Sequence, residues 1–533
     1  MYSNYTALQR EQLAKQTYID TQGLYLLIYA PGRRTLLEAS LSDQLHRKFR
    51  CVDHLGDALT SDVDGVVLAT EDAQWLPTAL MQYADALRAG ADLVVSDAVY
   101  GFGGETALYQ SHSHCAHAPC ALVSRELLER CRAEARDPEN VAELLELAYR
   151  LHTQRTCVPL ALLRYPRDLS ATDAFSPNGR RALLMSHVLD MTGAPIVLVS
   201  AVPVLRSLGY EVVVLGPEDG GSLELFVDAG AAVVTRAGCT SSAAQWGLAL
   251  SVDLVLANTI VEARAVRALS GTPVPVLWWL HDAFAGYPHI AHQIPRTLGK
   301  NVQLYAVGNH AAAAMLDVRP DFNIRPLIYG LPDYAQEDFP REDLGYSSRP
   351  LFATVGSFER RKGQDILCKA IRLLDPAVRA KANFLFVGKA ADKEMMDAVT
   401  ALTDEHPENV FYCKRMSRSE IKCLMEQCTG LICASRDDPM PTFVTEGLIF
   451  GKPSIVSEHT GTAGLITEGV DGFVYNDDDP AQLAAALTKA IEAPEALAAM
   501  APACRRLYET RYSKPAFVAA LTAAVHELVD EAE

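Results

Sequence analysis

The sequence predicts an α/β protein in which two consecutive domains, each built on a doubly wound parallel sheet, follow a shorter α/β block. Three observations lead to this prediction. The chain has 533 residues, too many for one hydrophobic core. Continuous apolar runs alternate with helical patterns twice along the chain, as expected when helices cover both faces of a parallel sheet. An acidic loop followed by a helical pattern stands between two of these runs, at residues 435–446, which is typical of a ligand site at the carboxyl edge of such a sheet.

Composition and charge restrict the class of protein. Apolar residues make up 49% and charged residues 21%, which are ordinary values for a soluble globular protein. The net charge of -18 argues against nucleic acid as the main partner. The sequence contains no run of about 18 or more apolar residues, so we expect no membrane span. The polar N-terminus is unlike a signal peptide. Twelve scattered cysteines indicate reduced thiols. We therefore expect a cytoplasmic protein.

Three blocks and a final helix are expected along the chain. The first block, residues 1–167, has strand patterns at 24–29, 65–69 and 92–96 and a helical pattern at 76–88, with one clear strand before Gly65. Residues 165–179 form a linker with two prolines and Asn178-Gly179. The second block, 180–335, has strands at 182–186, 211–215, 231–234, 254–257 and 274–279 and a helix at 195–208. The third, 345–512, has strands at 351–355, 383–387, 410–412, 429–434 and 454–456 after a hinge near 331–348; residues 513–533 carry the final helix.

Two acids follow the strand at 429–434. Asp438 lies in a proline-broken loop, and Glu446 comes about two turns later in the helical pattern. Ionised carboxylates accept hydrogen bonds from the hydroxyls of ribose and sugars, so the pair suits a polyol. Taken alone, Glu446 is also explained as an acid near a helix N-terminus.

A glycine turn after the strand at 351–355 predicts a diphosphate site. Gly356 opens the turn, and the cations Arg360, Arg361 and Lys362 precede the next helix. Free backbone N–H groups at a helix N-terminus and adjacent cations bind phosphate. The alternative is an exposed basic turn.

Polar groups also end strands of the second block. His281 and Asp282 follow the strand at 274–279, where a neutral imidazole can donate to a sugar hydroxyl. A histidine beside two tryptophans is also compatible with a core position. Asn258 and Asn309 end other strands of the same edge and are weaker candidates for the acceptor side. Gly193 follows the block's first strand and permits a close backbone approach.

Residues 180–512 resemble the family 4 glycosyltransferases, retaining enzymes of the GT-B fold, in which the ligand lies in the cleft between two Rossmann-like domains. The resemblance implies that Asp438 contacts the transferred sugar and that Glu446 holds the ribose, with Met440, Pro441, Thr442 and Phe443 between them in the donor segment. Three residues depart from the family pattern: Asp438 replaces a glutamate, Ser357 stands where arginine is frequent, and Ala194 replaces a second glycine.

The same resemblance assigns the other candidates. Lys362-Gly363 matches the family's phosphate-binding pair, with Arg360 or Arg361 as the second cation. Gly193 allows the approach of the donor phosphates, and His281 contacts the donor sugar. The catalytic set expected is thus His281, Asp438 and Lys362.

The resemblance implies a retaining, hexosyltransferase-type enzyme that moves a sugar from a nucleotide-diphosphate sugar to a glycan or lipid-linked acceptor, in bacterial surface polysaccharide assembly. It implies no metal and no cofactor beyond the nucleotide sugar. It leaves open association with the inner face of the membrane or with a biosynthetic complex. Two alternatives remain: a sugar-nucleotide epimerase of GT-B fold, and a noncatalytic protein that binds sugar nucleotides or glycans.

The first block resembles part of a family 2 glycosyltransferase of GT-A fold. That family's Asp-x-Asp falls on Ala69, Thr70 and Glu71, so one carboxylate of a divalent-metal site is missing. We interpret the block as a degenerate, noncatalytic module. The alternative is a second working transferase that uses Glu71, Asp72 and Asp97. The cluster His112–His117 with Cys120 invites a zinc interpretation, but its spacing is too crowded for one tetrahedral site.

Overall fold

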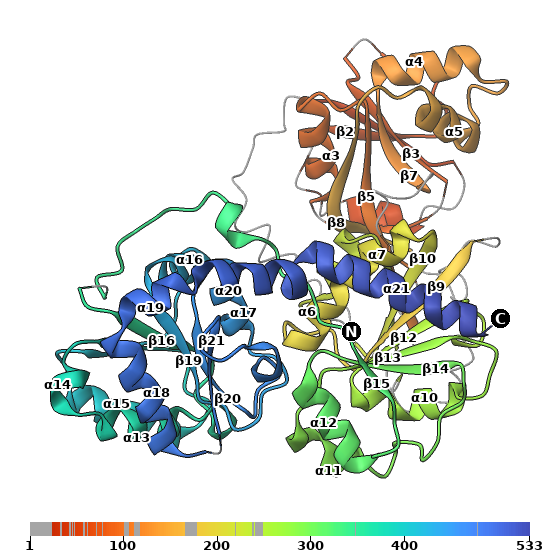
Figure 1. Cartoon of the computed structure of the whole chain (residues 1–533). Helices are drawn as coiled ribbons and strands as arrows, with labels where there is room; N and C mark the ends of the chain where they lie inside the picture. Colours follow the sequence, from red (N-terminus) through yellow and green to blue (C-terminus); the bar gives the residue numbers. More distant parts are fainter. Residues whose placement is uncertain are drawn as a thin grey trace. The chain divides into compact units, whose positions relative to one another are not determined.

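The structure is a computed structural model. It describes residues 24–165 apart from 32–34, 42–43, 45, 47, 57–58, 61, 71, 77, 101–105 and 111–117; residues 179–236 apart from 219; residue 239; and residues 249–532 apart from 347 and 477. For residues 106–110, 159–162, 164–165 and 532 it describes the backbone. The chain forms two compact units, Met1–Ala257 and Asn258–Glu533. Figure 1 shows the helices and strands of the whole chain, coloured along the sequence. Within the described residues, no helix combines the length and apolar character needed to cross a membrane.

The N-terminal part of the first unit is a mixed sheet. Its strands lie in the order β2 (Phe49–Val52), β1 (Leu26–Tyr29), β3 (Gly65–Ala69), β7 (Cys120–Ser124) and β5 (Leu93–Tyr100). The first three run parallel, and β7 is antiparallel to β3 and β5. β8 (Arg155–Tyr165) pairs with β5 and with β4 (Gln74–Trp75). The helices are α2 (Thr35–Leu41), α3 (Ala79–Arg88), α4 (Arg125–Glu134) and α5 (Val141–Leu151).

This sheet corrects one expectation for the first block. Two strands precede Gly65, because Phe49–Val52 forms β2 beside β1. The four residues of β2 include an exposed arginine and only one fully buried side chain, so no continuous apolar run marks this edge strand. The linker expected at 165–179 lies mostly outside the described residues.

A parallel sheet completes the first unit. β11 (Ala232–Arg236), β10 (Tyr210–Gly216), β9 (Arg180–Ser186) and β12 (Leu254–Asn258) follow in that order. β6 (Thr106–Gln110) pairs antiparallel with β11 and joins the two sheets through the backbone. The helix expected at 195–208 is two helices, α6 (Gly193–Val199) and α7 (Ala201–Ser207). Pro203 has no N–H to donate to the carbonyl of Val199, which accounts for the break near Ser200. α8 (Leu223–Asp228) precedes β11.

The second unit contains a six-stranded parallel sheet in the order β18 (Val410–Cys413), β17 (Asn383–Val387), β16 (Leu351–Val355), β19 (Gly430–Cys433), β20 (Ser454–Ser457) and β21 (Gly472–Tyr475). The strands β16 and β19 are neighbours although two strands separate them in the sequence. In such a doubly wound sheet the order reverses there, and ligands bind at the carboxyl ends of these two strands. Both strand ends carry predicted site segments. Only β21 was not expected among these strands.

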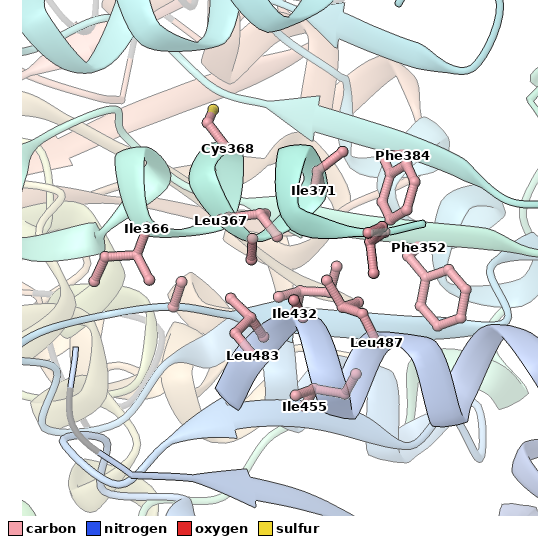
Figure 2. Close-up of a cluster of buried hydrophobic side chains, with 14 of the residues drawn as sticks. Phe352, Ile366, Leu367, Cys368, Ile371, Phe384, Ile432, Ile455, Leu483 and Leu487 are labelled. Atoms are coloured by element: carbon pink, nitrogen blue, oxygen red, sulfur yellow. The ribbon is translucent and has the colours of Figure 1, made fainter. Parts of the chain in front are cut away.

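Helices cover both faces of this sheet because successive side chains of each strand alternate in direction. On one face, side chains such as Phe352, Phe384, Ile432 and Ile455 pack against α13 (Gln364–Leu373), α15 (Lys393–Glu405) and α18 (Pro480–Glu492). Figure 2 shows this cluster, with Leu367 and Leu483 facing the strands. On the other face, the neighbouring strand residues pack against α16 (Arg418–Gln427) and α17 (Thr442–Ile449).

The remaining elements of the second unit begin with β13 (Val276–Leu280), β14 (Val302–Ala306) and β15 (Ile324–Pro326), which pair in parallel in this order. α10 (Ala263–Leu269), α11 (Tyr287–Ile290) and α12 (Asn309–Val318) lie among them in the sequence. After α14 (Pro376–Arg379), α19 (Pro494–Ala499) and α20 (Ala501–Leu507), the chain ends in α21 (Lys514–Ala532), which confirms the expected final helix. Phe517 of α21 stacks on Trp279 of β13, with ring centroids 5.6 Å apart.

Candidate functional site

The two acids lie where the sequence places them, one in a loop and one in a helix. β19 ends at Cys433, and α17 begins at Thr442. Asp438 therefore lies in the connecting loop, with its side chain 5% exposed. Glu446 lies in the second turn of α17, with its side chain 9% exposed. Both are buried carboxylates, which require charged or hydrogen-bonding partners.

The partner of Asp438 is Lys362. Its Nζ donates to Asp438 Oδ2 over 2.6 Å, and Nη1 of Arg361 lies 4.0 Å from the other carboxylate oxygen. The backbone N–H of Met440 also donates to Asp438, over 3.3 Å. Lys362 and Arg361 belong to η5 (Arg360–Lys362), the turn after β16. The fold thus brings the predicted diphosphate cations against the predicted sugar-contacting acid.

Two glycines shape this turn. Gly363 has φ of 67°, and a Cβ there would overlap the carbonyl oxygen of Ala434, so a side chain is excluded. Gly356 has φ of 150°, and a Cβ on it would meet no atom within 4 Å. Space is therefore open at Gly356, as a bound anion would require.

The two arginines of this turn differ in exposure and in contacts. Arg360 is exposed, and its carbonyl accepts from Nη1 of Arg436 over 2.8 Å. Arg361 is half-buried, and its Nη1 donates to the carbonyl of Asp437 over 2.9 Å. Arg361 is therefore the arginine that lies beside the acid loop. Which of the two arginines reaches a diphosphate stays a prediction.

Ser357 makes a contact that the sequence did not suggest. Its hydroxyl donates to Glu359 Oε1 over 2.9 Å, and Nη2 of Arg361 reaches the same oxygen over 3.0 Å. The carbonyl of Ser357 accepts from Gln364 at the start of α13, over 2.9 Å. Glu359 thus places a further carboxylate next to the candidate cations.

Glu446 is paired with Arg418, a residue that sequence reasoning missed. Nη1 of Arg418 donates to Glu446 Oε1 over 2.6 Å. Burial raises the pKa of Glu446, and the charge and hydrogen bond of Arg418 oppose that rise. The available signal was the capping box of Ser417 and Glu420, which fixes the start of α16 and places Arg418 in its first turn. Nothing in the sequence connects that turn to α17.

The donor segment between the two acids is packed on both sides. Met440 and Phe443 are buried, and Phe443 belongs to the core beneath the sheet. Pro441 precedes the first residue of α17 and makes the N-cap. The hydroxyl of Tyr329 lies 3.2 Å from that of Thr442 and donates to the carbonyl of Met440 over 3.4 Å. These contacts restrain the loop.

His281 and Asp282 follow β13, as expected. The Asp282 carboxylate accepts from the backbone N–H of Ile260 over 2.7 Å. Burial raises the pKa of Asp282 to about 6, although this hydrogen bond opposes the rise. The ring of His281 lies 4.6 Å from that of Trp279, centroid to centroid, and is partly buried. Both residues stand at the carboxyl end of the strand.

A second pairing links this strand end to the acid loop. Oδ1 of Asp437 lies 2.7 Å from Nε2 of His310, and the backbone N–H groups of Phe284 and Ala285 donate to the two carboxylate oxygens over 3.2 and 3.0 Å. Although burial favours the neutral acid, the hydrogen bond from His310 and those from the backbone hold the pKa of Asp437 below its usual value. Asp437 therefore connects the residues after His281-Asp282 with the residues before Asp438.

The weaker candidates, Asn309, Asn258 and Gly193, differ in position and exposure. Asn309 is exposed at the first residue of α12, and a Cβ on Gly464 would overlap its side chain. Asn258 is fully buried at the end of β12. Gly193 begins α6 in the first unit, and a Cβ there would meet nothing within 4 Å.

Only some of the candidate residues of the first block lie among the described residues. Both oxygens of Asp72 accept hydrogen bonds from the start of α2, from Leu36 and Leu37. Asp97 is buried in β5, and Glu71 and residues 112–117 lie outside the described residues. Across the described ranges, no group of three or more His, Cys, Asp or Glu side chains is placed to hold a metal ion.

Two family models match the chain. Residues 178–314 match the model described as glycosyl-transferase family 4, and residues 336–507 match the model described as glycosyl transferases group 1. Among curated proteins, an uncharacterised glycosyltransferase of Methanocaldococcus jannaschii is 28% identical over 130 residues, which cover 24% of this chain and 34% of that protein. A glycogen synthase of Pseudomonas syringae pv. tomato is 25% identical over 171 residues, 32% of this chain and 34% of the relative. The matches thus span about a third of each relative.

Solved structures share the fold of about two thirds of the chain. The Anabaena protein HepE, in complex with UDP and glucose, aligns with a TM-score of 0.52 at 18% identity, over 65% of this chain and all of that one. Sucrose-phosphate synthase from Thermosynechococcus elongatus aligns with a TM-score of 0.50 at 15% identity, over 66% of this chain and 99% of its own. At these identities the likeness shows the fold alone, which is that of Rossmann-like parallel-sheet domains of GT-B type.

Proposed function

Because residues 178–314 belong to glycosyltransferase family 4 and residues 336–507 to glycosyltransferases group 1, we propose that this protein transfers a sugar from a nucleotide-diphosphate donor. The observation that carries the proposal is the contact of Lys362 with Asp438 at the carboxyl ends of β16 and β19. This contact is a direct hydrogen bond between a cation that can neutralise a diphosphate and an acid that can accept from sugar hydroxyls. HepE, a protein of the same fold, is described with UDP and glucose bound.

The proposed chemistry uses preorganised charge. Lys362 and Arg361 hold the diphosphate beside the open space at Gly356 and stabilise its departure. Asp438 then turns from Lys362 toward the sugar, and His281 donates to a sugar hydroxyl. A phosphate oxygen on the same face accepts the proton of the acceptor hydroxyl, so the anomeric configuration is retained and no protein nucleophile or metal is needed.

The acceptor proposed is a glycan or a lipid-linked glycan, in bacterial surface polysaccharide assembly. The setting proposed is the cytoplasm, with access to the inner face of the membrane. Asn309 and Asp282 line the acceptor side in this proposal, supported by the exposure of Asn309 beside Gly464. For the first block we propose a noncatalytic GT-A-like module, supported by the commitment of both Asp72 oxygens to α2.

The test begins with a thermal-shift screen of nucleotide sugars, because a ligand that binds only the folded state raises its melting temperature. Transfer by Lys362→Ala and Glu446→Ala variants is then measured with the donor found. Each variant should lose about 100-fold or more in turnover. Lys369→Ala is the matched control, since Lys369 is an exposed cation in the second turn of the following helix, α13, where it pairs with Asp365. Normal turnover in both site variants would refute the donor-site assignment.

A noncatalytic sugar-nucleotide-binding protein is the second candidate, favoured by Ser357. Its hydroxyl donates to Glu359 and offers no charge to a diphosphate. Such a protein would bind the donor with neither transfer nor slow donor hydrolysis. Incubating the enzyme with donor alone also separates both candidates from an epimerase, which would convert the donor sugar without any acceptor.

A further inference from the structure

Arg418 connects two parts of the second unit that lie far apart in sequence. Its Nη1 donates to the buried Oε1 of Glu446 over 2.6 Å. Its guanidinium also lies over the ring of Tyr334, 4.1 Å from the centroid, although half of the side chain remains exposed. Tyr334 belongs to η4 (Tyr334–Gln336), in the segment that leads to β16. One exposed arginine therefore donates a hydrogen bond to a buried acid and lies over an aromatic ring.

The charge on Glu446 depends on this arginine. Burial raises the pKa of Glu446, and Arg418 is the cation that opposes the rise. Among the residues that the structure describes, the other titratable groups facing Glu446 are the phenols of Tyr334 and Tyr329. Burial raises their pKa values, so both are neutral near pH 7. Among the described residues, no second cation forms an ion pair with Glu446.

We propose that Arg418 is a positioning residue that prepares Glu446 to accept the hydroxyls of the donor's ribose. The proposal deepens the proposed function and rests on it. Arg418 donates to Oε1 and restrains the carboxylate. In this proposal Oε2 and the remaining lone pairs accept from the sugar of the nucleoside. An ionised carboxylate accepts hydrogen bonds only, whereas a protonated one spends one oxygen as a donor and fits a diol less well.

Two consequences follow for nucleotide binding. Removal of Arg418 lowers the affinity for the nucleoside, because protonation of a buried carboxylate becomes more favourable when its cationic partner is lost. The loss grows as the pH falls, since protonation of Glu446 then competes with ribose. Pyrophosphate, which has no ribose, binds Lys362 and the turn at Gly356 and is not affected.

The experiment is calorimetric titration of the full chain at about pH 6, 7 and 8. The probes are inorganic pyrophosphate and whichever of UDP, GDP, ADP and dTDP the wild-type protein binds. The variants are Arg418→Gln, Arg418→Lys and Glu446→Gln, with Lys422→Gln as matched control. Lys422 lies one turn further on α16, contacts the same Tyr334 ring and pairs with Glu337, so its loss disturbs the same surface without touching Glu446.

We expect Arg418→Gln to weaken nucleotide binding about tenfold at pH 7 and more at pH 6, with pyrophosphate binding unchanged. Arg418→Lys should recover part of the affinity, and Lys422→Gln should match wild type. Glu446→Gln should weaken binding equally at every pH, and adding Arg418→Gln to it should cause little further loss. If Arg418→Gln does not fold, Arg418→Lys carries the same pH comparison against Lys422→Gln.

Wild-type affinity in Arg418→Gln at every pH would overturn the proposal. An equal loss of pyrophosphate and nucleotide binding would also overturn it, because Arg418 would then act on the whole site. A wild-type chain that binds pyrophosphate but none of the four nucleotides would instead refute the proposed function itself, and these results are distinguishable in one set of titrations.

Discussion

At the scale of single residues, the buried carboxyl groups of the second unit differ in whether a partner compensates their burial. Asp437, Asp438 and Glu446 each have a cationic or backbone donor within hydrogen-bond distance. Glu262 differs from them. It is 1% exposed in η2 (Ile260–Glu262), and its Oε2 makes no hydrogen bond among the described residues. Burial raises the pKa of Glu262 to about 8, so the side chain carries its proton at neutral pH.

Replacing Glu262 by glutamine should therefore change how stability depends on pH. The ordinary pKa is 4.5 and the folded value is about 8, so the stability that comes from the bound proton is complete below pH 4.5 and is lost as the pH rises through 8. Relative to Glu262→Gln, wild type should lose about 1.4 kcal/mol per pH unit across this window. Melting temperatures of both proteins from pH 5 to 9 check this; parallel curves would show that Glu262 has a partner at high pH.

Single glycines show what sequence could and could not tell. Gly363 was expected from the Lys-Gly pair, and its positive φ and close approach to Ala434 explain why no other residue fits. Gly193 was expected to permit a close approach through its backbone. Its φ is not positive, so the backbone conformation there does not require glycine. The space around it is open, and the missing side chain leaves that space free. A sequence shows that a glycine is present, but only packing shows which property is used.

At the scale of elements, the loop between β19 and α17 does more than present the two acids. Asp437 accepts from Phe284 and Ala285 at the start of η3 (Phe284–Gly286) and lies 2.7 Å from His310 of α12. Three donors from two elements converge on one carboxylate of a third. This fixes the distance between the tip of β13, with His281, and the acid loop, with Asp438.

Asp437→Ala should therefore disturb the position of His281 relative to Asp438 more than it weakens donor binding. The three donors lose their acceptor, so the melting temperature should fall, and turnover should drop about tenfold or more as His281 and Asp438 lose register. The affinity for a nucleoside diphosphate should change little, because the groups proposed to bind it lie at Lys362 and Glu446. Steady-state kinetics and calorimetry measure the two effects. Asp397→Ala, which removes an exposed acid paired with Lys393 on α15, is the control; equal turnover in both variants would contradict the role.

The elements themselves were largely predictable, and their side-chain pairings were not. β16 and β17 have the expected bounds because continuous apolar runs bounded by turn residues mark buried parallel strands. The spacing of Asp438 and Glu446 predicted one acid in the loop and one in the helix, as found. The partners Arg418 and His310 are 28 and 127 residues away from the acids they meet, and no local pattern encodes such contacts.

At the scale of the whole molecule, the first block and the parallel sheet of the first unit share a backbone ladder. β6 pairs antiparallel with β11, from Thr106↔Arg236 to Tyr109↔Val233. A chain cut at residue 168 would lose β6 and leave β11 as an open edge, which is a template for aggregation. The block therefore has a structural effect on the sheet next to it, whatever its evolutionary origin.

Removal of residues 1–167 should accordingly lower solubility and melting temperature while leaving donor turnover per folded molecule nearly unchanged. Every residue proposed for donor or acceptor binding lies at Gly193 or beyond, so the chemistry should survive in the fraction that stays monomeric. Light scattering measures the aggregated fraction, and transfer assays on the monomer peak measure turnover. A soluble, monomeric truncated chain that binds the donor but transfers no sugar would contradict the noncatalytic interpretation. Glu71, Asp72 and Asp97 would then be the residues to test, because they are the acids of the block proposed for a second reaction. Adding the separate block to the truncated chain would distinguish the two causes: restored transfer would indicate a catalytic contribution of the block, and no restoration would indicate a lost fold.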